Sequence, residues 1–159
     1  MVVWENMEII DSQELLVYDE KLSVTEEALS INKIDIEKHK QSAISSFQAI
    51  EKIFLFINKH FPEQRKITLA GHNVHFDVNF LRFFFSQNNE NFSKFFSHRI
   101  INTSSILYYQ YLAGHLKHRA ISSDEAFDLF EIKVEGRHTA LGDAIATAKL
   151  FTKLLYRTK

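Results

Sequence analysis

Two aspartates and one histidine stand in sequence settings that suit a hydrolytic site. Asp77 follows a short apolar run and a polar turn, and it precedes an apolar pattern at helical spacing. Asp143 opens a second such pattern, and His138 lies five residues before it. Carboxylates hold divalent cations, and a histidine with a pKa of about 6.5 offers a neutral base at physiological pH. This combination is typical of metal-assisted hydrolysis.

The elements that must position these residues predict an α/β domain. Residues 67–70 read as a short apolar strand that ends at Gly71, and residues 78–85 read as a helix. In α/β domains, catalytic groups often lie on the polar turn that connects a strand to the following helix. Asp143 lies in the first turn of a terminal helix with one apolar face, formed by Ala144, Ile145, Ala148, Phe151 and Leu155.

Cap and turn signals predict the remaining elements. Apolar runs at residues 1–4, 9–10 and 15–18 indicate a meander of short strands. Ser45 and Gln48 fit a capping box for a helix that Pro62 ends, and Ser122 and Glu125 fit another. Shorter helical pieces follow Thr25 and cover residues 36–40. The predicted order is strands, helices, strand, helices.

Two short motifs, GHNVHFD at residues 71–77 and HTALGDA at residues 138–144, contain the candidate site residues. They resemble the second and third motifs of the DnaQ-like 3′-5′ exonucleases, in the DEDDh subgroup, whose last motif carries a histidine. Residues 15–39 and 100–129 also look like the family's segments around these motifs. The resemblance implies an RNase H-like fold, with a mixed sheet flanked by helices, and a single exonuclease-like domain over residues 1–159.

The resemblance implies roles for five residues. Asp77 and Asp143 match metal ligands, and His138 matches the base that deprotonates the attacking water. Asn73 and Phe76 match positions close to the terminal nucleotide. The implied cofactor is Mg²⁺ or Mn²⁺, and the implied substrates are single-stranded or frayed nucleic-acid 3′ ends, from which nucleotides are removed one at a time. Whether DNA or RNA is preferred, and whether the role is proofreading, repair or turnover, stays open.

The family's first motif, a strand bearing Asp-x-Glu near the N-terminus, has no match at the start of this chain. Asp11 and Glu14 come nearest, but residues three apart on a regular strand face opposite sides. The missing strand is the first and central one of the family's sheet, so its neighbours need another partner. We expect an N-terminally truncated domain, or one with a misassigned start, that is weak or inactive as given. A natural remnant that binds without cutting, and a strand supplied by another chain, are the alternatives.

A smaller departure concerns Asn102, because related exonucleases often carry aspartate at the corresponding strand end. The rival reading of the whole chain is a catalytically dead domain of the same fold that binds nucleic acid or a partner. A structural module related only by fold comes third, since such a module has no use for His138, Asp77 and Asp143 together.

Composition fits one globular domain. The 159 residues are 45% hydrophobic and include 15 phenylalanines, which we expect mostly in the core. The absence of cysteine excludes disulfides, thiolate metal sites and a cysteine nucleophile. A net charge of −1 argues against a protein that coats nucleic acid. Neither a signal-peptide pattern nor an apolar run of about 20 residues occurs, so we expect a cytoplasmic protein, with its oligomeric state open.

Overall fold

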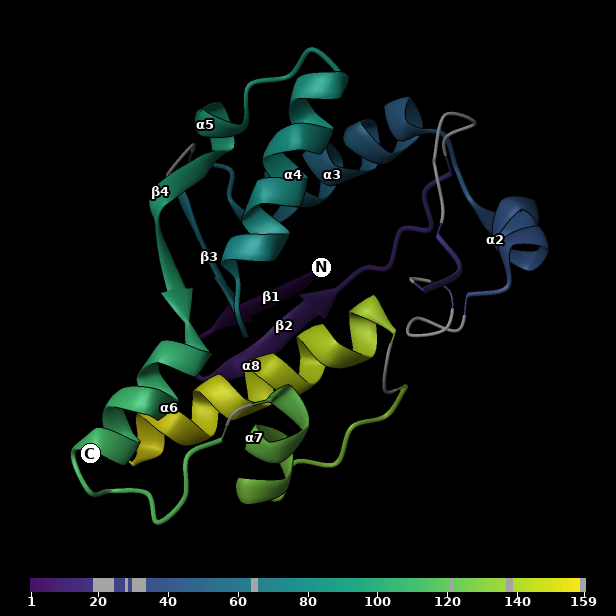
Figure 1. Cartoon of the computed structure of the whole chain (residues 1–159). Coiled ribbons are helices and arrows are strands. Elements are labelled where there is room, and N and C mark those ends of the chain that lie inside the picture. Colours follow the sequence, from purple (N-terminus) through teal and green to yellow (C-terminus); the bar gives the residue numbers. More distant parts are fainter. Residues whose placement is uncertain are drawn as a thin grey trace.

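The structure is a computed structural model that describes residues 1–18, 25–27, 29, 34–63, 66–120, 122–136 and 139–157. His138 lies outside the described residues. Strands and helices alternate along the chain, which confirms the α/β class (Figure 1). None of the described helices combines the length and apolar character needed to cross a membrane. The elements are β1 Val2–Glu5, β2 Glu8–Ser12, α2 Ile36–Ser42, α3 Ser46–His60, β3 Ile67–Gly71, α4 His75–Gln87, α5 Phe92–Phe95, β4 Phe96–Asn102, α6 Thr103–Leu112, α7 Ser123–Leu129 and α8 Ala140–Tyr156.

The chain begins with a β-hairpin. β1 and β2 pair antiparallel, and the turn residues Asn6 and Met7 have φ values of 50° and 72°. Positive φ at both central positions is what a two-residue hairpin turn of type I′ requires. The prediction of a further meander strand at residues 15–18 is wrong, because Val17 forms only an isolated parallel bridge with Ile44. This segment bonds to the residues that lead into α3 instead of to β2.

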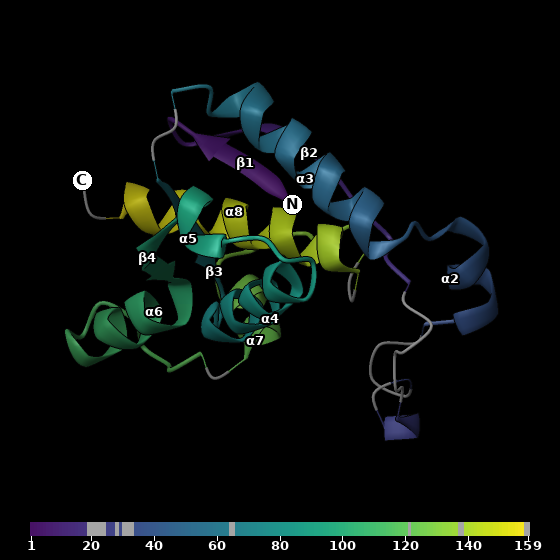
Figure 2. The ribbon, with the colours of Figure 1, turned by 90° about the horizontal axis from the view of Figure 1, so that it is seen from above.

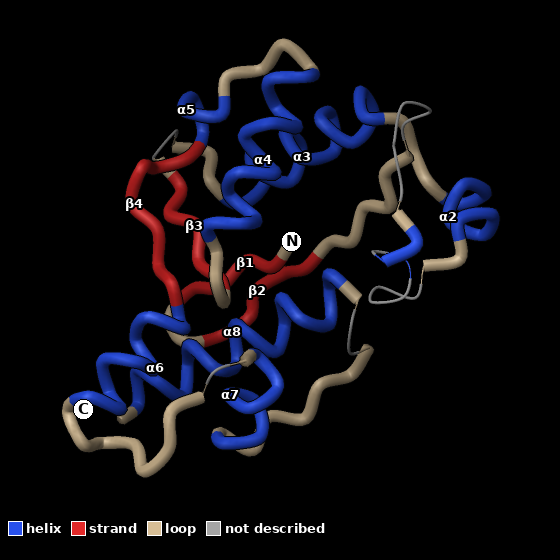
Figure 3. The backbone as a smooth tube through the Cα atoms, viewed as in Figure 1, coloured by secondary structure: helices blue, strands red, loops and turns tan. Residues whose placement is uncertain are grey.

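β3 and β4 form a separate parallel pair. Leu69 lies opposite Ile100, and Gly71 lies opposite Asn102. The carboxyl ends of the two strands therefore meet at one edge, where α4 and α6 begin. No described strand joins this pair to the hairpin, so the described strands form two two-stranded sheets (Figure 3). Both sheets pack against α8. Since two-stranded sheets are marginal alone, the helices must stabilise them.

The hairpin lies between α3 and α8, while α2 lies at the periphery (Figures 1 and 2). On the α8 side, the indole Nε1–H of Trp4 donates to Thr152 Oγ1 at 2.8 Å, and the rings of Trp4 and Phe151 lie 4.9 Å apart. On the α3 side, Asp11 binds Lys59 and His60. The hairpin is thus held from both faces.

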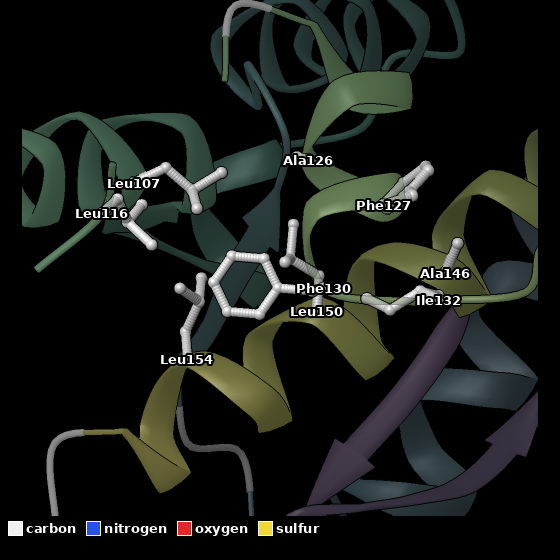
Figure 4. Close-up of a cluster of buried hydrophobic side chains, with 9 residues drawn as sticks. All are labelled: Leu107, Leu116, Ala126, Phe127, Phe130, Ile132, Ala146, Leu150 and Leu154. Atoms are coloured by element: carbon white, nitrogen blue, oxygen red, sulfur yellow. The ribbon is translucent and has the colours of Figure 1, made fainter. Parts of the chain in front are cut away.

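Two apolar cores fill the domain. One joins α6, α7 and α8 through residues such as Leu107, Phe130 and Leu150 (Figure 4). The other joins α3, α4, α5 and the parallel strands, around the fully buried Phe85. The expectation of phenylalanines in the core holds for the second cluster, where Phe85, Phe92 and Phe96 pack edge to face or tilted. It fails for four exposed ones: Phe47, Phe76, Phe80 and Phe83.

The predicted helix caps determine where two helices start. Ser45 Oγ accepts the N–H of Gln48 at 3.2 Å, and Gln48 Oε1 accepts the N–H of Ser45 at 3.1 Å. This reciprocal pair confirms the predicted capping box of α3. Ser122 Oγ accepts the N–H of Glu125 at 3.1 Å and caps α7 as predicted.

Candidate active site

The turn from β3 to α4 carries three of the predicted site residues. A side chain at Gly71 would meet Val74 Cβ at 3.0 Å, so the glycine allows the chain to fold back tightly. Asn73 has a φ of 59°, a conformation that asparagine tolerates better than most residues. Phe76 and Asp77 then lie in the first turn of α4, and both side chains are exposed. The turn therefore presents Asn73, Phe76 and Asp77 together.

Polar side chains at the end of β4 hold this turn in place. Asn102 Oδ1 accepts the backbone N–H of Asn73 at 2.9 Å, and it also caps α6 by accepting the N–H of Ser104 at 3.3 Å. The Ser104 hydroxyl donates to Asn73 Oδ1, at 2.8 Å, and lies 2.9 Å from Asn102 Oδ1. Among the described residues, the amide NH₂ of Asn73 has no acceptor, so it stays a donor for a ligand.

A second bridge joins the same two loops. His72 Nδ1 lies 3.1 Å from the hydroxyl of Thr103, and that hydroxyl donates to the carbonyl of Gly71 at 3.3 Å. With its hydrogen given to Gly71, Thr103 accepts from Nδ1–H of a neutral His72. Burial lowers the pKa of His72, which favours the same neutral form. Thr103 is completely buried, so this bridge is a fixed part of the scaffold.

Asp77 lies in a partly desolvated setting. Its side chain is exposed as a whole, yet neighbouring protein atoms displace water from part of the carboxyl group. This desolvation raises the pKa of Asp77, although the hydrogen bond from its own backbone N–H acts in the opposite direction. A bound cation would stabilise the ionised carboxylate and offset the desolvation.

Asp143 lies in the first turn of α8, whose start is tightly built. Thr139 Oγ1 accepts the N–H of Gly142 at 3.0 Å and donates to the carbonyl of Gly136 at 2.7 Å. A side chain on Gly142 would meet the carbonyl oxygens of Gly136 at 2.2 Å and Glu135 at 2.5 Å. The segment before the helix therefore packs directly on the turn that carries the half-buried Asp143.

The structure groups three of the predicted site residues but does not test whether the other two lie beside them. Asn73, Phe76 and Asp77 share one turn, while Asp143 lies on α8, which packs against β3. Convergence of Asp143 and His138 on Asp77 stays a prediction. Across the described part of the chain, no three histidine, aspartate or glutamate side chains gather as a metal site. The described donors thus do not complete a two-cation site.

Asp11, the nearest substitute for a first-motif carboxylate, is engaged elsewhere. Its Oδ2 lies 2.7 Å from Lys59 Nζ and 2.8 Å from His60 Nε2. Hydrogen bonds from Lys59 and His60 lower the pKa of Asp11 to about 2. Glu14, its proposed companion, lies beyond the end of β2. Asp11 therefore ties the hairpin to α3 and is not placed to replace the missing motif.

Two residues that hold the β3–α4 turn in place were not identified from the sequence. Thr103 and Ser104 bridge to His72 and Asn73, but neither belongs to a motif. The run Asn102-Thr103-Ser104 directly after an apolar strand is a helix-cap signal that could have indicated them. It could not have revealed that their partners lie about thirty residues earlier in the chain.

Comparisons with known proteins support an exonuclease relationship for the chain. A family model described as Exonuclease matches residues 2–151. A curated relative, Ribonuclease T of Yersinia enterocolitica, is 27% identical over 135 residues, which are 84% of this chain and 60% of the relative. The chain thus spans about 60% of the length of that relative.

Proposed function

This chain belongs to the Exonuclease family, and from that premise we propose that it is a DEDDh-type 3′-5′ exonuclease domain. Its substrates in this proposal are single-stranded or frayed nucleic-acid 3′ ends, from which it removes nucleotides one at a time. The observation that carries the proposal is the β3–α4 turn, which presents Asn73, Phe76 and Asp77 side by side. The lack of cysteine suits the reducing cytoplasm, where we place the protein.

Each proposed residue has a distinct task. Phe76 stacks on the base of the terminal nucleotide, and the free amide of Asn73 donates a hydrogen bond to the same nucleotide. Asp77 and Asp143 are the proposed ligands of Mg²⁺ or Mn²⁺, and a bound divalent cation makes water more acidic. His138 takes the proton of the attacking water. The Asn102–Ser104 bridge keeps Asn73 in position.

We also propose that this chain, without a first-motif strand, has low activity. Two-metal hydrolysis needs several carboxylates around two ions about 3.5–4 Å apart. The described residues do not complete such a set, and Asp11 is bound to Lys59 and His60. A cation with few anionic ligands keeps most of its water and is weakly held.

The β3–α4 turn with its exposed Asn73, Phe76 and Asp77 also supports a second candidate, a catalytically silent domain that binds nucleic acid or a partner. A further candidate is a domain whose missing strand is supplied by another chain, because each two-stranded sheet has edges that no described strand covers. Exposed edges are ready templates for an added strand. A chain that supplies an Asp-x-Glu strand there would add both the missing pairing and the missing carboxylates.

End-labelled cleavage tests the proposal. The unextended chain should release no mononucleotides from a 3′-labelled single strand above the rate of a His138→Ala control. A version extended at its N-terminus by a strand with the sequence Asp-x-Glu-Thr-Thr-Gly should release them, and Asp143→Ala in that version should abolish the release. An inactive extended version would leave the silent binding domain as the better reading. Robust His138-dependent cleavage by the unextended chain would show that another carboxylate fills the vacant position.

A further inference from the structure

Helix α4 exposes three phenylalanine rings. Phe76, Phe80 and Phe83 are 77%, 63% and 62% exposed, while the opposite face of the helix buries Val78 and Phe85. Residues three and four apart are neighbours on a helix surface, so the three rings form one stripe. At a rise of about 1.5 Å per residue, the stripe extends over about 10 Å.

The stripe begins at the proposed active site. Phe76 directly precedes Asp77, and Phe80 lies one turn further along, next to both of them. Because helical side chains lean toward the N-terminus, Phe80 covers the turn that carries Phe76 and Asp77. Figure 1 shows α4 leading away from the carboxyl end of β3. A strand whose last nucleotide lies at Phe76 can therefore continue along the helix.

The size of the stripe favours a small occupant. An aromatic side chain buries about 150–250 Å² when covered, so three rings with these exposures offer about 300–500 Å². A stable protein interface takes about 800 Å² from each partner. The stripe is too small for such an interface alone, yet it is a contiguous apolar patch of the kind that marks a binding site.

The chemistry of the stripe favours nucleobases. All three side chains are flat rings, and bases of any sequence stack on aromatic rings. Each ring follows its neighbour by about 4.5–6 Å along the helix axis, which gives successive bases separate rings. The net charge of −1 leaves little general attraction for phosphates, so stacking must supply most of the affinity.

We propose that Phe76, Phe80 and Phe83 form a stacking track that holds the last unpaired bases of a single strand. The polarity, with the 3′ end at Phe76, rests on the proposed function. Stacking needs no cation, so the track binds in the presence of EDTA. Because few phosphates are neutralised, the affinity depends only weakly on salt.

Fluorescence anisotropy with a 5′-fluorescein-labelled oligothymidylate in EDTA tests the track. The double variant Phe80→Leu/Phe83→Leu keeps apolar side chains but removes two rings. Each lost stack should weaken binding about 5- to 150-fold. Phe80→Trp should bind at least as tightly as the wild type. The matched control is Phe47→Leu on α3, where a phenylalanine that is 66% exposed lies outside the track and should not affect binding.

Equal binding by the wild type and the double variant would overturn the track, as would undetectable binding by the wild type. Sedimentation velocity gives a further check: a wild-type dimer that the leucine variant turns into a monomer would identify the stripe as a contact between copies, and would also overturn it. Failure of the track would leave cleavage by the extended version intact, whereas loss of cleavage with binding retained would overturn only the exonuclease proposal.

Discussion

Replacing Gly142 with alanine should destabilise the chain, against the ordinary preference of helices. In an unobstructed helix, alanine is about 1 kcal/mol more favourable than glycine. Here the added Cβ would lie 2.2 Å from Gly136 O and 2.5 Å from Glu135 O, and both obstacles are backbone atoms. Overpacking costs about 1–3 kcal/mol, and backbone obstacles place this site at the upper end. The net loss in the free energy of unfolding should be about 1–2 kcal/mol.

Urea unfolding followed by circular dichroism measures this loss as a lower midpoint with an unchanged slope. Gly142→Ser, with one more atom, should cost more than Gly142→Ala. Gly114 is the control: its φ is 76° and no atom lies within 4 Å of an added Cβ, so only backbone strain matters. There asparagine, although larger than alanine, should cost less, because it tolerates positive φ. A midpoint for Gly142→Ala at or above that of the wild type would show that the carbonyl groups of Glu135 and Gly136 do not obstruct a side chain at this position.

Three further predictions concern the site. Without metal at pH 7, Asp77→Asn should stabilise the chain by less than about 1 kcal/mol, since the exposed carboxylate is largely screened; thermal unfolding measures this. Asn102→Ala should cost about 0.5–2 kcal/mol in urea unfolding because α6 loses its cap, whereas Asn102→Asp should keep most of that stability. Calorimetry should find millimolar or weaker Mn²⁺ binding to the chain as given.

The pH dependence of the Asp77 variant checks its cause. A raised pKa in the folded state means that the folded chain binds more protons than the unfolded chain as the pH rises above about 4. The wild type therefore loses stability as the pH rises through the folded-state pKa, while Asp77→Asn does not. The difference between them should vanish below about pH 4. A stability difference that persists below this pH would mean that the substitution acts through something other than the carboxyl group's titration. In the calorimetric experiment, tight binding of two Mn²⁺ per chain would contradict the prediction of weak binding.

Local signals in the sequence predicted the local structure well. The capping box of Ser45 and Gln48 and the cap at Ser122 depend on residues three apart, so the sequence contains all of their chemistry. The turn that carries Asn73 and Asp77 was predicted for the same reason. Val17 shows the limit: its run suits a strand, but whether it pairs with β2 or with Ile44 depends on how α3 packs.

Long-range contacts of polar residues could not be predicted. The spacing of Asp11 and Glu14 argued against a metal-binding pair, but only the packing of α3 on the hairpin reveals Lys59 and His60 beside Asp11. The bonds from Ser104 and Asn102 to Asn73 depend on the parallel register of β3 and β4. The exposure of Phe80 and Phe83 was likewise hidden, because a phenylalanine in a helical pattern reads as core whichever face is covered.

The position of bound Mn²⁺ tests the proposed site most directly. Crystals of the version extended by the Asp-x-Glu strand would be soaked with Mn²⁺ and a nucleoside 5′-monophosphate, and anomalous diffraction would locate the ion. We expect a Mn²⁺ peak bound by the carboxylates of Asp77 and Asp143, with His138 beside it and the base of the nucleotide against Phe76. Asp77 and Asp143 on opposite faces of the domain, with Mn²⁺ bound to neither, would contradict it.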